Sequence, residues 1–97
     1  MALPLFLKID VTNDDIVNAY FAKRRGLRSW AQCCPISTAI TRQLGTTDVS
    51  TNQSGVMVNG EAYESSPAVI DYIRKVDATI DASTNGIPAQ TFYLKHA

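Results

Sequence analysis

Hydrophobic residues recur along this chain with two different periods, and this change of period constrains the fold more than any other feature. From Leu5 to Val11 an aliphatic residue occupies every second position, which places four side chains on one face of a strand. After Asp14, and again after Pro67, the apolar spacing changes to three or four residues, as in amphipathic helices. The pattern therefore predicts an α+β fold.

The first predicted helix follows the opening strand directly. Thr12 or Asn13 can cap it, so we expect it to begin near Asp14 and to run to about Arg24, with Gly26 as its stop. The apolar residues of this helix predict a broad apolar stripe made of Ile16, Val17, Ala19, Tyr20 and Phe21.

Two further helices are predicted from proline and glycine positions. Pro35 is typical of a first helical residue and Gly45 of the residue after the last, which predicts a helix over 35–44. Ser66 and Pro67 open another helix. Its predicted apolar stripe is Val69, Ile73, Val76 and Ile80. The segment from Gly26 to Cys34 has no clean period, so we expect a connection in which Trp30 packs inward.

The remaining strands are short. Valines at 49, 56 and 58 flank a turn over residues 52–55, and Thr91–Lys95 predicts a closing strand. Asn59-Gly60 leaves two interpretations open for residues 55–63, a hairpin or one strand with a bulge. The element order predicts a four-stranded, mostly antiparallel sheet with helices packed on one face, ferredoxin-like in outline.

Length and composition limit the class of protein. We expect residues 1–97 to form one domain, because 97 residues support a single hydrophobic core. No apolar run approaches the ~18 residues of a membrane span or follows a basic leader, which favours a cytoplasmic protein. Cys33 and Cys34 are adjacent, a spacing that strains a disulfide, so both are expected to be reduced. Two cysteines and one histidine are too few ligands for a zinc site, and no metal or cofactor is predicted.

The net charge is zero, but the two halves of the chain differ. Six basic and three acidic residues precede Thr46, whereas three basic and six acidic residues follow from that position. One basic face can therefore exist on a neutral protein. The densest cluster comprises Lys23, Arg24, Arg25 and Arg28, with Trp30 two residues further along. We predict this segment as the partner-binding region, for another protein or, alternatively, for a nucleic acid.

A thiol function is the remaining alternative. Cys34 precedes the helix that starts at Pro35, and free amides at a helix N-terminus can lower a thiol pKa. The chain's histidine, His96, lies next to the C-terminus and is expected to be solvated. No phosphate loop, dinucleotide fingerprint or nucleophile elbow occurs in the sequence, so we expect a protein that is not an enzyme.

Three stretches resemble a group of small bacteriophage and prophage accessory proteins of unassigned function. They are Cys34 to Ile40, Val58-Asn59-Gly60-Glu61-Ala62-Tyr63 running into the Pro67–Asp77 helix, and the closing Phe92-Tyr93-Leu94. The resemblance implies a virus-encoded protein in the host cytoplasm that binds and inhibits a host component, such as a defence nuclease in the manner of anti-CRISPR proteins. It carries over no functional residue. The sequence does not decide the oligomeric state, and a homodimer is one alternative.

Overall fold

The computed structural model describes residues 5–26, 29, 32, 34–80 and 86–97 of the chain. The elements follow the predicted order, β1 (Phe6–Val11), α1 (Asn13–Arg25), α3 (Pro35–Leu44), β2 (Val49–Asn52), β3 (Gly55–Val58), β4 (Glu61–Tyr63), α4 (Pro67–Thr79) and β5 (Gln90–Lys95). The α+β class is therefore confirmed. The predicted connection, including Arg28 and the inward packing of Trp30, lies largely outside the described residues.

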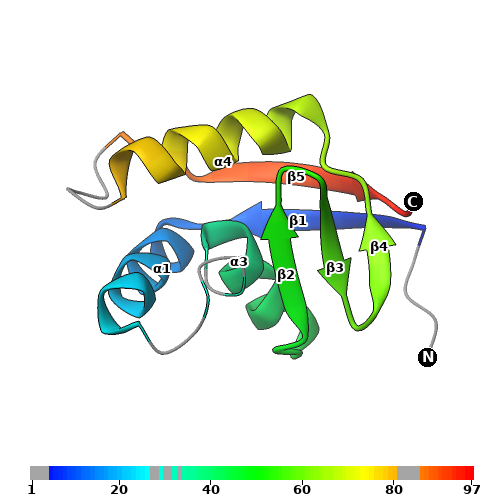
Figure 1. Ribbon diagram of the computed structural model, residues 1–97, viewed down its shortest axis with the longest axis horizontal. Coiled ribbons are helices and arrows are strands. Elements are labelled where there is room, and N and C mark those ends of the chain that lie inside the picture. The colour runs from blue at the N-terminus through cyan, green and yellow to red at the C-terminus, as the bar shows by residue number, and fades with distance from the viewer. Residues whose placement is uncertain (1–4, 27–28, 30–31, 33, 81–85) are drawn as a thin grey trace.

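The strands form two antiparallel sheets rather than the one four-stranded sheet predicted. β1 pairs with β5, while β2, β3 and β4 pair in sequence order and cross in front of that ribbon in Figure 1. An isolated bridge between Tyr63 and His96 joins the two sheets, through hydrogen bonds from the Glu64 amide to the Lys95 carbonyl and from the Ala97 amide to the Ala62 carbonyl. The pairing therefore does not confirm a ferredoxin-like topology. Strand spacing in the sequence carries no signal for which edges meet, because that choice depends on how the helices fill the core.

The interval 55–63 is a hairpin. Asn59 and Gly60 both have positive φ, 51° and 81°, as a two-residue type I′ turn requires, so β3 and β4 are separate strands. Asparagine tolerates this conformation better than other non-glycine residues, and glycine adopts it without a Cβ clash. Local chemistry therefore specifies this turn.

Within the described residues, the core lies between the inner faces of the two sheets and the helices α1, α3 and α4. β1 shows strict alternation, with Leu7, Ile9 and Val11 buried, although Leu5 just before the strand is 61% exposed. On α4 the buried residues are Val69, Tyr72 and Val76, whereas Ile73 is half-buried. Tyr72 was not predicted. Its ring packs edge-on against Phe92 and its hydroxyl donates to the Pro88 carbonyl at 2.9 Å.

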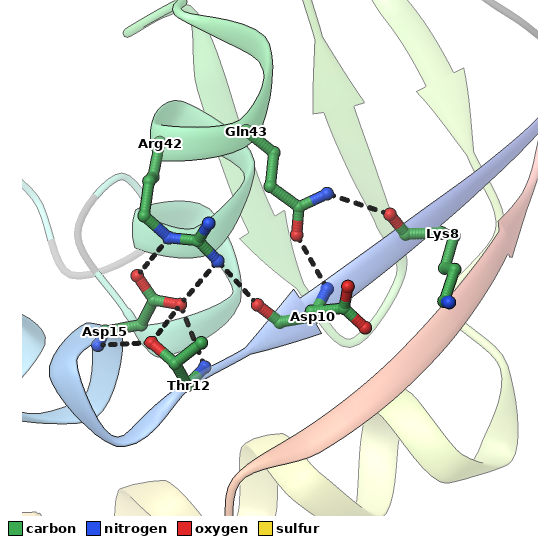
Figure 2. A network of polar contacts seen from close by, with 6 residues as sticks. All are labelled: Lys8, Asp10, Thr12, Asp15, Arg42 and Gln43. Atoms are coloured by element: carbon green, nitrogen blue, oxygen red, sulfur yellow. Dashed lines mark hydrogen bonds and ion pairs between the residues drawn. The ribbon is translucent and has the colours of Figure 1, made fainter.

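One buried carboxylate ties α1 to α3. Asp15 is 1% exposed, and its two oxygens accept hydrogen bonds from Arg42 at 3.0 and 3.1 Å. Asp15 also completes a capping box with Thr12: the Thr12 backbone amide donates a hydrogen bond of 2.9 Å to the Asp15 carboxylate (Figure 2). Burial by itself would raise the pKa of Asp15, but the bonds from Arg42 and Thr12 outweigh it and hold the pKa below its ordinary value.

The same end of α3 closes the free edge of β1. The Gln43 side chain accepts from the Asp10 amide at 2.7 Å and donates to the Lys8 carbonyl at 2.9 Å, so it replaces a neighbouring strand (Figure 2). Arg42 adds a bond of 2.8 Å to the Asp10 carbonyl. A pair of adjacent polar residues on α3 therefore fixes this helix against the strand, which limits edge-to-edge association at this point.

Asp15→Asn is expected to destabilise the fold by about 1–3 kcal/mol at neutral pH, because an amide cannot pair with Arg42 as a carboxylate does. The pKa of Asp15 is lowered on folding, so its contribution is present above the unfolded pKa and is lost as pH falls through the folded value. Urea unfolding at about pH 7 and pH 3 measures both effects. Asp14→Asn, an exposed change in the same helical turn, is the control; equal losses in the two variants contradict the assignment.

A second titrating contact lies where the two sheets meet. His96 Nε2 is 2.5 Å from Glu61 Oε2, and the bond raises the pKa of His96. A raised pKa gives a contribution that is present below the ordinary value and lost as pH rises through the folded one. Glu61→Gln should therefore lower the unfolding midpoint near pH 6 and have no effect near pH 9. Glu64→Gln, in the segment just after β4, is the control, and a pH-independent loss in Glu61→Gln contradicts this role.

Candidate functional site

The basic end of α1 is the part of the predicted partner-binding region that lies within the described residues. Lys23, Arg24 and Arg25 occupy the last turn before Gly26, which adopts the left-handed conformation at φ 65°. Cations at this position complement the negative end of the helix dipole. Lys23 is half-buried, whereas Arg24 and Arg25 are exposed, so the two arginines are the ones presented to solvent.

One of these arginines, Arg24, packs on an aromatic ring. The Arg24 guanidinium lies 5.4 Å from the centre of the Tyr20 ring and donates to the Tyr20 hydroxyl at 3.1 Å. Tyr20 in turn meets Phe21 edge-on, with ring centres 5.6 Å apart. These contacts restrict the rotamers of Arg24, so less entropy is lost when it binds a partner.

The prediction that Val17 and Phe21 belong to the apolar stripe of α1 is wrong. Both are exposed, at 40% and 50%, while Ile16 and Ala19 fill the core. The helix packs through a narrower stripe than its sequence suggests, because its contacts are mainly with α3. Residues 17, 21, 24 and 25 have the i, i+4, i+7, i+8 spacing of one helical face. We call Val17, Phe21, Arg24 and Arg25 the α1 surface.

Arg28 and Trp30, the other two residues predicted to bind a partner, lie outside the described residues. Their place in the site therefore stays a prediction. Sequence reasoning missed Val17 and Phe21 as surface residues because their apolar character at helical spacing is the usual signal for core. The sequence did offer one signal: Ile16 and Ala19 are three residues apart on one helical face, and Val17 lies one position away from Ile16, on a neighbouring face that Phe21 shares.

Cys34 lies in the wall of a pocket of about 210 Å³ between α3, β2 and α4. Its side chain is buried, and its Sγ donates to Ser37 Oγ at 3.6 Å; Ser37 in turn bonds Thr51 Oγ1 at 2.8 Å. Burial raises the pKa of the Cys34 thiol, and the hydrogen bonds around it do not reverse this direction. The thiolate fraction needed for nucleophilic or redox chemistry is therefore small.

Nucleophilic thiol chemistry also needs a general base beside the thiol, and among the described residues the histidine is bonded elsewhere. His96 is half-exposed and bonds Glu61 and the Ala97 carbonyl, while the Cys34 thiol contacts Ser37. Within the same residues no group of three histidine, cysteine, aspartate or glutamate side chains could hold a metal ion. The geometry around Cys34 therefore favours packing over catalysis.

The Cys34 thiol should be slow to react. In a Cys33→Ala variant, where Cys34 is the remaining cysteine, a disulfide probe near pH 7.5 is expected to label the folded protein many-fold more slowly than the urea-unfolded protein, because burial disfavours the thiolate. A short cysteine peptide gives the unhindered rate. Labelling of the folded chain as fast as that of the peptide contradicts this prediction and revives the thiol alternative.

Comparison with known proteins gives no relative from which a site could be transferred. No family of known proteins matches the chain, and neither a curated protein nor a solved structure is similar to it. Function has to follow from the chemistry of the surfaces that the fold presents.

Proposed function

We propose that this protein is a non-enzymatic binding protein that occupies a surface of a partner macromolecule through the α1 surface. The observation that carries the proposal is the half-exposed Phe21 ring beside two outward-facing arginines. The exposed half of this ring adds no buried area to the fold, whereas on a partner it becomes buried apolar area. Aromatic residues and arginine also dominate the energetics of known protein interfaces.

The charge of the α1 surface indicates the chemistry of the partner. Arg24 and Arg25 stand at the end of a helix whose exposed acidic residue, Asp14, lies in the opposite first turn. An acidic patch with an apolar centre would therefore match this face, with guanidinium–carboxylate pairs around a buried Phe21. Such an interface blocks its target by occupancy and requires no catalytic group.

The resemblance to small bacteriophage proteins supports a host-directed role. In that setting the protein would act in the host cytoplasm and inhibit a host component, for which a defence nuclease is one candidate. No helix among the described residues is long and apolar enough to cross a membrane. A chain of this size suits stoichiometric association because one exposed face can contact a partner without a second domain.

Two variants of the α1 surface and a charge-matched control test the proposal. Arg24→Ala plus Arg25→Ala, and separately Phe21→Ser, are expected to weaken capture of partner from a bacterial lysate at least tenfold, because they remove the ion pairs and the apolar anchor. Arg74→Ala plus Lys75→Ala removes the same charge from exposed positions on α4 and should leave capture unchanged. Quantitative mass spectrometry of the bound fraction measures the difference.

Retention of all captured species by both α1 variants contradicts the proposal. A nucleic-acid partner at the same surface gives a different result in a salt titration, because phosphate contacts release counterions and the affinity then falls linearly in a log–log plot. A shallow salt dependence supports a protein partner. Turnover of a small molecule by the purified chain would overturn the non-enzymatic assignment.

A further inference from the structure

The outer face of the β1–β5 ribbon carries a second, chemically different surface. In both strands alternate residues face away from the core, and the outward ones near the end where β1 begins are Phe6, Lys8, Tyr93 and Lys95. Phe6 is 57% and Tyr93 66% exposed, so Tyr93 is the most exposed of the large hydrophobic side chains in the described residues. We call these four residues the ribbon face.

The strand register arranges the ribbon face as two crossed diagonals. Phe6 lies opposite Lys95, and Lys8 lies opposite Tyr93. Each ring therefore has an ammonium group directly across the ribbon, and the two rings are diagonal neighbours, a separation of roughly 7–8 Å between their backbone positions. Two flat rings at this spacing can each stack against one of two successive bases of an unpaired strand.

Charge decides which occupant suits this face. Lys8 and Lys95 are both exposed, while Asp10, the other outward residue of β1, accepts a bond of 2.7 Å from Thr91 Oγ1 at the opposite end. A second copy of the chain placed face to face would bring lysines against lysines, which is repulsive. A polyanion with aromatic groups satisfies both the ammonium groups and the exposed rings.

The surroundings of Tyr93 leave room for a nucleotide. Tyr93 and Lys95 also line a hollow of about 460 Å³ together with the hydroxyl-bearing Ser54, Ser65 and Ser66. Glu64 lines the same hollow and would repel a phosphate placed inside it, so a base or sugar is expected in the hollow and the phosphates outside it, where the exposed Lys8 and Lys95 side chains can reach them.

We propose that the ribbon face binds single-stranded nucleic acid, with bases stacked on Phe6 and Tyr93 and phosphates held by Lys8 and Lys95. This site is separate in sequence and in secondary structure from the α1 surface. Its recognition is by stacking and charge, so it is expected to tolerate many base sequences. Duplexes should bind more weakly, because their bases are already stacked and cannot lie on the rings.

Fluorescence anisotropy with a labelled oligothymidylate of about 12 nucleotides tests the proposal on the full chain at about 50 mM salt. Phe6→Thr and Tyr93→Thr keep a residue that favours strands, so they remove the rings without disturbing β1 or β5. Each is expected to weaken binding about 5- to 150-fold. Lys8→Gln and Lys95→Gln should each reduce the salt slope by about 0.7.

Control variants and competitors test whether the ribbon face itself holds the oligonucleotide. Met57→Thr alters an exposed apolar residue on β3 and should leave affinity unchanged, as should Arg24→Ala plus Arg25→Ala. Oligouridylate in place of oligothymidylate shows whether RNA or DNA is preferred, and either result supports the site. Polyglutamate, a polyanion without bases, should compete poorly.

Three outcomes overturn the proposal. They are no binding of either oligonucleotide at protein concentrations of about 100 µM, full affinity in the doubly substituted Phe6→Thr, Tyr93→Thr protein, and competition by polyglutamate as strong as by oligothymidylate at equal charge. Circular dichroism on each variant confirms that the strands are intact. Because the arginine variant reports on the α1 surface alone, failure here and failure of the proposed function are distinguishable.

Discussion

The attachment of α3 to the open edge of β1 is the interaction on which the arrangement of this protein depends. A two-stranded ribbon has two unpaired edges, and a ribbon of this size is not stable by itself in water. Here the Gln43 amide pairs with the backbone of Lys8 and Asp10 as a strand would, and Arg42 joins Asp10 to the buried Asp15. One turn of helix therefore fixes a strand and a second helix together.

The same contacts determine what is left exposed. Because Asp15 turns toward Arg42, the face of α1 that carries Ile16 and Ala19 packs inward and the face that carries Val17 and Phe21 points to solvent. The inner face of the ribbon packs into the core, whereas on its outer face Phe6 and Tyr93 remain in water. Both proposed binding surfaces are consequences of how the core closes.

The two surfaces differ in the partners they suit. The α1 surface combines guanidinium groups with one apolar centre on a helix, which fits an acidic protein patch. The ribbon face combines ammonium groups with two rings on a flat sheet, which fits unpaired bases and phosphates. A protein with both surfaces suits a protein–nucleic acid complex as its partner, and neither surface needs a catalytic residue.

Local sequence chemistry determined most of the elements. Helix α1 begins after Thr12 and ends before Gly26, and α3 begins at Pro35 and ends before Gly45. Asn59-Gly60 forms the predicted turn. These features follow from the sequence because caps and turns depend on a few neighbouring residues. The basic end of α1 was also evident from the sequence. Tertiary structure alone decided the rest. Which strands pair, which apolar residues of α1 are surplus to the core, and whether the Cys34 thiol is buried all depend on contacts between residues far apart in the chain. Asp15 shows the reason most clearly: in sequence it is an ordinary first-turn carboxylate, and only the approach of Arg42, 27 residues later, makes it the buried link between α1 and α3.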